Sequence, residues 1–167
     1  LLCGALSFAQ EVKIIPQPVQ LKKNSGSFVI NSQTKLVVAN KENEATATFL
    51  NKYLADYYGF KLQIVKKADK NSIEFKSLKN IEGLKSESYS LKSNEEGVVI
   101  EGNSPTGTFY GMQTLIQLLP VEKSNSLKIA SVEVKDGPRF AYRGAMLDVG
   151  RHYFPVSFVK KYIDYLA

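Results

Sequence analysis

The chain has 167 residues, of which 44% are hydrophobic and 23% are charged, and its formal net charge is +6 at pH 7. This length can bury one substantial hydrophobic core but not two large ones. The lysines are scattered and no nucleic-acid recognition motif accompanies them, so we expect no nucleic-acid partner. With one His and one Cys, the chain cannot assemble a typical His/Cys ligand set, and we expect neither a metal nor a cofactor.

The first ten residues have the character of a signal peptide that lacks its basic start. Residues 1–6 are mostly apolar, and Ser7 and Ala9 offer the small side chains of a signal-peptidase site. We therefore interpret residues 1–10 as a signal-peptide remnant and expect export to a periplasm or to the extracellular space. An acylated Cys3, which would associate the protein with the outer membrane, is the alternative. We find no other segment that is long and apolar enough to span a membrane.

Residues 11–137 predict an α+β domain built on one sheet. Seven β-branched or aromatic runs predict strands over 27–30, 35–39, 61–66, 72–76, 87–92, 97–101 and 130–134. Polar turns rich in Asn, Ser and Gly separate most of these runs. Several runs alternate apolar and polar residues, which indicates one buried and one wet face and hence a mostly antiparallel sheet.

Two helices are expected to pack on this sheet, the first of them over residues 45–57. Phe49, Tyr53 and Tyr57 recur every four residues, and this spacing predicts that an aromatic face packs on the sheet. Asn43 can cap the beginning of this helix. Gly59 can adopt the left-handed conformation after its end.

The second helix is expected between Ser104, as the cap, and Pro120. Pro105 fits the first turn. Gly107 and Gly111 lie on one face and each costs about 1 kcal/mol relative to alanine in a helix interior, so we expect this face to approach the sheet closely. The glycine spacing is not that of a phosphate-binding loop, and no Lys-Ser or Lys-Thr pair follows, so we predict no phosphate site.

The turn at residues 136–138 predicts a domain boundary, and residues 138–167 predict a strand, a polar loop and a helix. Period-two alternation over 143–151 places five residues on one strand face: Arg143, Ala145, Leu147, Val149 and Arg151. Apolar residues spaced by three and four over 156–166 predict the helix. This unit repeats eight times in a (β/α) barrel, whose active sites lie at the carboxyl ends of the strands. We therefore expect a truncated first unit of a TIM barrel.

These segments resemble the β-N-acetylhexosaminidases, glycoside hydrolase family twenty. RGAMLDVGRHYFPVSFVKKYID, over 143–164, is similar to the first strand and helix of that family's barrel, and LDVGRHYFP, over 147–155, is the most specific part of the resemblance. Residues 107–115 are similar to the helix of the small domain that precedes the barrel, and residues 15–18 to the start of that domain. The resemblance implies an exo-acting enzyme that hydrolyses terminal GlcNAc or GalNAc from glycans, and residues 1–10 add the expectation that it is exported. It also implies substrate-assisted retaining catalysis, in which the acetamido group of the substrate supplies the nucleophile.

For this chain the resemblance implies one substrate-binding residue, Arg151, which would donate hydrogen bonds to hydroxyls of the terminal sugar. A guanidinium is a planar fork of five donors and can grip two vicinal hydroxyls. The alternative is that Arg151 pairs with an acidic neighbour and only holds the loop. We expect Asp148 to hold loops or backbone donors, and His152 to be packed and hydrogen-bonded.

The resemblance assigns catalysis to an Asp-Glu pair on a later barrel strand. No Asp-Glu dipeptide occurs in this sequence, so we expect this chain alone to be inactive, with no catalytic residue of its own. The alternative is a non-catalytic bracing or binding module of another glycosidase family. The apolar residues after 144 and the apolar face of the last helix need partners, and burial is worth roughly 1.5–3 kcal/mol for each side chain. They should pack on the small domain, self-associate or lie disordered.

Overall fold

The computed structural model describes residues 12–78 and 85–166 and separates the chain into two compact units. The first unit ends at Gly137 and the second begins at Pro138. The signal-peptide prediction for residues 1–10 lies outside the described residues. Among the residues that the structure describes, none of the helices has the length and hydropathy needed to cross a bilayer.

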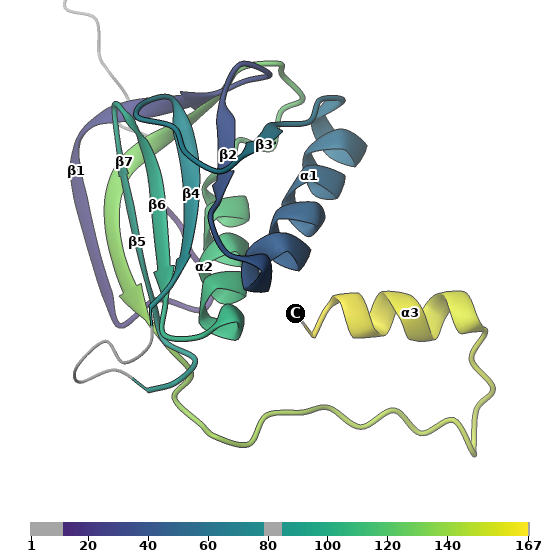
Figure 1. The fold of residues 1–167 in the computed structure, drawn as a ribbon. Helices are drawn as coiled ribbons and strands as arrows, with labels where there is room; N and C mark the ends of the chain where they lie inside the picture. The colour runs from purple at the N-terminus through teal and green to yellow at the C-terminus, as the bar shows by residue number, and fades with distance from the viewer. Residues whose placement is uncertain (1–11, 79–84, 167) are drawn as a thin grey trace, which may run out of the picture. The chain divides into compact units, whose positions relative to one another are not determined.

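The first unit is an α+β domain, as the sequence predicts, with one sheet and two helices (Figure 1). The strands are β1 (Gln20–Ile30), β2 (Lys35–Val38), β3 (Gln63–Val65), β4 (Ser72–Ser77), β5 (Tyr89–Asn94), β6 (Gly97–Gly102) and β7 (Leu127–Asp136). The helices are α1 (Glu44–Tyr58), preceded by the 3-10 turn η1 (Lys41–Asn43), and α2 (Pro105–Leu118). The strand order is β1-β7-β5-β6-β4-β2-β3.

The sheet has an antiparallel half and a parallel half. Strands β1, β7, β5 and β6 pair antiparallel with their neighbours in that order. Strand β6 pairs parallel with β4, β4 with β2 and β2 with β3. Parallel neighbours need a crossover connection, and α1 supplies one between β2 and β3. The alternation of apolar and polar residues does not distinguish the two kinds of pairing.

Both helices cover the same face of the sheet, and the core lies between them and that face (Figure 1). Fully buried strand residues in this core include Ile30, Leu36, Ile73, Phe75, Leu91, Ile100 and Ile129, and the helices add Leu50, Leu54, Met112 and Leu115. Burying each such side chain contributes roughly 1.5–3 kcal/mol. The first unit therefore carries the hydrophobic core that the composition predicts.

The ends of α1 lie where the sequence predicts them. Gly59 adopts the left-handed conformation, with φ of +80°, and donates its N–H to the carbonyl of Ala55 at 3.1 Å. Asn43 is the residue before the first turn, but its side chain does not cap the helix. The side-chain oxygen Oδ1 of Asn43 instead accepts a hydrogen bond from the Ser77 hydroxyl at 3.0 Å and so links the start of α1 to the end of β4.

The predicted orientation of α1 is wrong. Phe49 and Tyr57 are 42% and 57% exposed, while the buried face carries Ala47, Leu50, Leu54 and Tyr58. Smaller aliphatic side chains let this helix pack closely on the core. The aromatic residues contact one another instead: Tyr53 stacks on Tyr57 at 4.5 Å, and Phe49 meets Phe109 of α2 at 5.5 Å between ring centroids.

Helix α2 approaches the sheet through its glycines, which confirms the prediction. The Ser104 hydroxyl accepts the N–H of Gly107 at 3.2 Å and caps the helix. A Cβ atom on Gly107 would lie 2.4 Å from the carbonyl oxygen of Ser88, and one on Gly111 would lie 2.5 Å from the Ile100 side chain. Any larger residue at these two positions would force the helix away from the strands, so only glycine allows them to lie this close.

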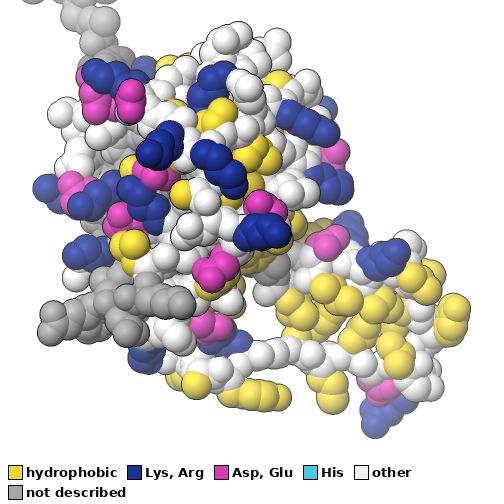
Figure 2. All heavy atoms as spheres, in the orientation of Figure 1, with side chains coloured by type: hydrophobic (Ala, Val, Ile, Leu, Met, Phe, Trp, Pro, Cys, Tyr) yellow, Lys and Arg dark blue, Asp and Glu magenta, His cyan; other side chains and the backbone are white. Residues whose placement is uncertain are grey.

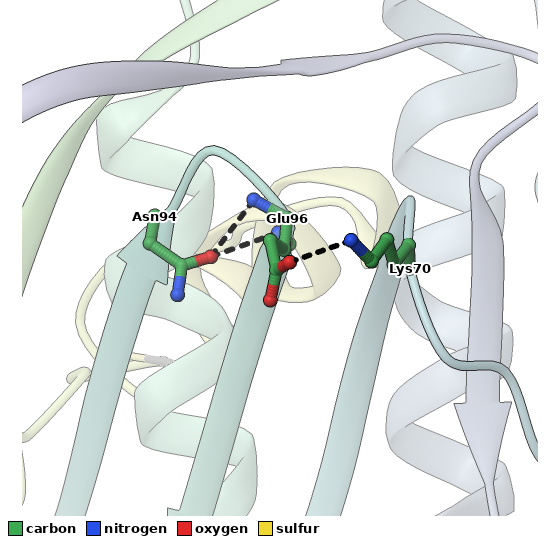
Figure 3. A network of polar contacts seen from close by, with 4 residues as sticks. Lys70, Asn94 and Glu96 are labelled. Carbon is green, nitrogen blue, oxygen red and sulfur yellow. Dashed lines mark hydrogen bonds and ion pairs between the residues drawn. The ribbon is translucent and has the colours of Figure 1, made fainter.

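Polar contacts tie together the turns at one end of the sheet (Figure 3). The side-chain oxygen of Asn94 accepts the N–H groups of Glu96 and Gly97, at 2.9 and 3.1 Å, and closes the turn between β5 and β6. Glu96 also pairs with Lys70 at 2.9 Å, and its carbonyl accepts the N–H of Asn71 at 2.7 Å. The turn is thereby joined to the segment that enters β4.

In the second unit, the helix predicted after residue 155 is present as α3 (Val156–Asp164), but the predicted strand over 143–151 is not formed. A parallel barrel strand takes its hydrogen bonds from a neighbour on each side. The described part of the chain provides no such neighbour, because every strand in it belongs to the first unit. Residues 143–148 are irregular, and Met146 is 90% exposed.

Candidate substrate-binding loop

The loop that carries Arg151 is built around the carboxylate of Asp148. One oxygen, Oδ1, accepts the backbone N–H groups of Gly150 at 2.9 Å and of Arg151 at 3.1 Å. This pattern is an Asx turn, a local hydrogen-bonded loop that Asp and Asn favour. The expectation that Asp148 holds backbone donors is therefore confirmed.

The second oxygen of the same carboxylate, Oδ2, lies 3.3 Å from Nε of Arg151. The side chain of Arg151 is 86% exposed and that of Asp148 is 42% exposed. The terminal nitrogens of Arg151, Nη1 and Nη2, donate no hydrogen bond to any residue that the structure describes. Arg151 is thus paired with an acidic neighbour and still presents four N–H donors outward.

Aromatic rings support this loop on its C-terminal side. Phe154 stacks on Phe158 of α3, with ring centroids 4.6 Å apart, and Phe158 lies 6.5 Å from Tyr162. The Tyr162 hydroxyl donates to the carbonyl of Met146 at 3.4 Å, which connects the helix to the segment before the loop. The three rings recur every four residues, and this spacing is the signal in the sequence from which their stacking could have been predicted.

The prediction that His152 is packed is wrong, because its side chain is exposed. Phe154, and not His152 or Tyr153, joins the aromatic stack. Among the described residues, no group of three or more His, Cys, Asp or Glu side chains lies close enough to hold a metal ion.

The apolar side chains of α3 are exposed, and they form the hydrophobic area over this helix in Figure 2. Val156, Phe158 and Ile163 are 68%, 42% and 58% exposed. Apolar residues on one helix face that remain in contact with water indicate a surface made for packing. In the described part of the chain, none of the residues of α3 is buried.

The first unit has a hollow on the side of the sheet away from the core. This hollow, of about 350 Å³, is lined largely by charged and polar side chains of β4, β5 and β6, among them Glu74, Lys76, Lys92 and Glu101. No aromatic ring belongs to its lining, so it lacks a stacking platform for a sugar. Figure 2 shows basic and acidic side chains interspersed on the visible face of this unit.

Comparison with known families assigns both units. Residues 11–137 match the family model described as "Glycosyl hydrolase family 20, domain 2", and residues 140–167 match "Glycosyl hydrolase family 20, catalytic domain". The chain thus combines the small α+β domain of a glycosidase with the first part of its catalytic domain. It belongs to glycosyl hydrolase family 20, and the alternative of a module from another glycosidase family is wrong.

Characterised relatives agree with this assignment. The chain is 40% identical over 163 residues to a β-hexosaminidase of Porphyromonas gingivalis, covering 93% of this chain and 21% of that protein. It superimposes on the exo-β-N-acetylglucosaminidase of Vibrio harveyi, solved with N-acetylglucosamine, with a TM-score of 0.80 and 29% identity, covering 92% of this chain and 23% of that one. For a mutant Streptomyces plicatus β-hexosaminidase in complex with its product GlcNAc, the TM-score is 0.81 and the identity 31%, over 91% of this chain and 31% of that one. The chain spans only about a fifth to a third of these relatives.

Proposed function

We propose that this chain is the N-terminal part of an exo-acting β-N-acetylhexosaminidase, which hydrolyses terminal GlcNAc or GalNAc from glycans. The observation that carries the proposal is the match of both units, in order, to the two domains of one glycosidase family. The relatives from Porphyromonas gingivalis, Vibrio harveyi and Streptomyces plicatus are named for this activity and support the same substrate class.

In this proposal Arg151 grips the terminal, non-reducing sugar. A sugar ring that carries an acetamido group at C2 and a glycosidic bond at C1 has one pair of vicinal ring hydroxyls, at C3 and C4. The outward donors of Arg151 have the planar fork that suits such a pair. Exposure of this side chain at the turn leaves it accessible to a ligand.

The chemical step in this proposal is substrate-assisted and retaining. The acetamido group of the substrate attacks the anomeric carbon, and carboxylic side chains from later in the barrel orient that group and protonate the leaving oxygen. Since the sequence contains no Asp-Glu dipeptide, we expect the 167-residue chain by itself to show no hydrolysis.

The test uses the full-length enzyme and the 167-residue chain on aryl β-glycosides of GlcNAc, GalNAc and glucose. We expect the full-length enzyme to cleave the two acetamido sugars and not the glucoside, because glucose lacks the internal nucleophile. We expect no turnover by the 167-residue chain. Cleavage of the glucoside at a comparable rate, or no cleavage of either acetamido sugar, would contradict the proposal.

We also propose that the protein is exported, on the basis of residues 1–10. Fractionation of the native cells should place it in the periplasm or outside the cell. Activity found only in the cytoplasmic fraction would contradict export, whatever the result of the glycoside test.

The exposed apolar face of α3 supports a further proposal, that the 167-residue chain self-associates. Sedimentation should show a dimer or a larger species that the charged substitution Phe158→Asp weakens. The exposed Lys160→Asp variant is the control. A wild-type chain that sediments as a monomer at high micromolar concentration would contradict the proposal.

A further inference from the structure

The carboxylate of Asp148 performs two tasks at once. Its Oδ1 accepts two backbone N–H groups of the turn, and its Oδ2 contacts Nε of Arg151. The first task shapes the loop, and the second acts on the side chain that the proposed function assigns to the sugar. The two tasks use different oxygens and so can be separated by substitution.

We propose that Asp148 is a positioning residue, which holds Arg151 by Nε so that Nη1 and Nη2 face the C3 and C4 hydroxyls of the terminal sugar. This inference rests on the proposed function of Arg151. An arginine that is 86% exposed has many accessible rotamers, and a guanidinium fork binds two hydroxyls only in one plane. The ion pair through Nε restricts the orientation of the guanidinium plane before the substrate binds. It leaves the two terminal nitrogens available to bind the sugar hydroxyls.

A carboxylate is required for this role, although an amide would suffice for the turn. In an Asp148→Asn variant, the side-chain oxygen can still accept the N–H groups of Gly150 and Arg151. The amide is neutral, and the nitrogen that replaces Oδ2 is a donor, so it cannot form the ion pair with Nε of Arg151. This substitution therefore keeps the loop and removes the hold on the guanidinium.

The experiment measures kcat/KM of the full-length enzyme on an aryl β-GlcNAc glycoside and on its 4-deoxy analogue. We expect Asp148→Asn to lower kcat/KM about tenfold on the complete sugar, since small misplacements of a binding group cost this much or more. We expect a change of less than about twofold on the analogue, because it lacks one of the hydroxyls that Arg151 grips. Asp164→Asn, an exposed change on α3 of the same chain, is the matched control and should leave both values unchanged.

The outcomes separate this inference from the proposed function. Equal losses on both sugars, or no loss on either, would overturn the positioning role of Asp148. If an Arg151→Met variant instead cleaves the complete sugar with the same kcat/KM as wild type, then Arg151 does not bind the sugar. The inference about Asp148 is then wrong as well. If Asp148→Asn unfolds, which a thermal melt detects, Asp148→Ser replaces it, because a serine hydroxyl can also accept the turn N–H groups.

Discussion

Replacing Gly107 by alanine tests how closely α2 packs on the sheet. In an exposed helix interior this change stabilises by about 1 kcal/mol, since alanine is the better helix former. Here the added Cβ would lie 2.4 Å from the carbonyl oxygen of Ser88, about 0.6 Å closer than the 3.0 Å below which Cβ contacts essentially do not occur. The oxygen belongs to the backbone and cannot rotate away, so the helix must move off the strand.

Such overpacking typically costs about 1–3 kcal/mol. Subtracting the gain of about 1 kcal/mol in helix propensity, we expect Gly107→Ala to lower the free energy of unfolding by up to about 2 kcal/mol, because the clash is with backbone that cannot rotate away. Urea unfolding of the 167-residue chain, followed by far-UV circular dichroism, measures this value. Thr106→Ala is the control, because Thr106 is an exposed neighbour in the same helix and should become slightly more stable. A Gly107→Ala chain as stable as this control would refute the close contact.

Three other changes test the same domain by the same measurement. Ser104→Ala should cost about 1 kcal/mol by removing the cap of α2, whereas Ser104→Asn should cost much less; equal losses would contradict the capping role. Ser93→Ala should cost about 1–3 kcal/mol, because the hydroxyl donates to the carbonyl of Ala130 at 2.8 Å and accepts the N–H of Val132 at 2.9 Å; an unchanged midpoint would show that water replaces it. Burial raises the pKa of Tyr89 to about 12, so the unfolded chain loses this proton first, and stability should fall by roughly 2–3 kcal/mol as the pH rises from 10 to 12. Tyr89→Phe should show a smaller fall over this window, and an identical fall would contradict the assignment.

Much of the first unit is determined locally and was therefore predictable from the sequence. The cap at Ser104, the left-handed Gly59 and the alternation in strands such as β5 act within a few residues, and the structure confirms each of them. The glycines of α2 predicted a close approach because their cost in helix propensity required compensation elsewhere. The motif over residues 143–164, which contains Arg151, likewise identified the family without any tertiary information.

Other features depend on contacts between distant segments, and only the tertiary structure decided them. The parallel half of the sheet and the buried face of α1 follow from which strands and helices meet, and local periodicity does not contain that information. The segment 143–148 has the sequence of a buried strand, yet it is irregular where no neighbouring strand completes its hydrogen bonds. The contact of Asp148 with Nε of Arg151 also required coordinates, because a regular strand would place the two side chains on opposite faces, and the turn brings them together.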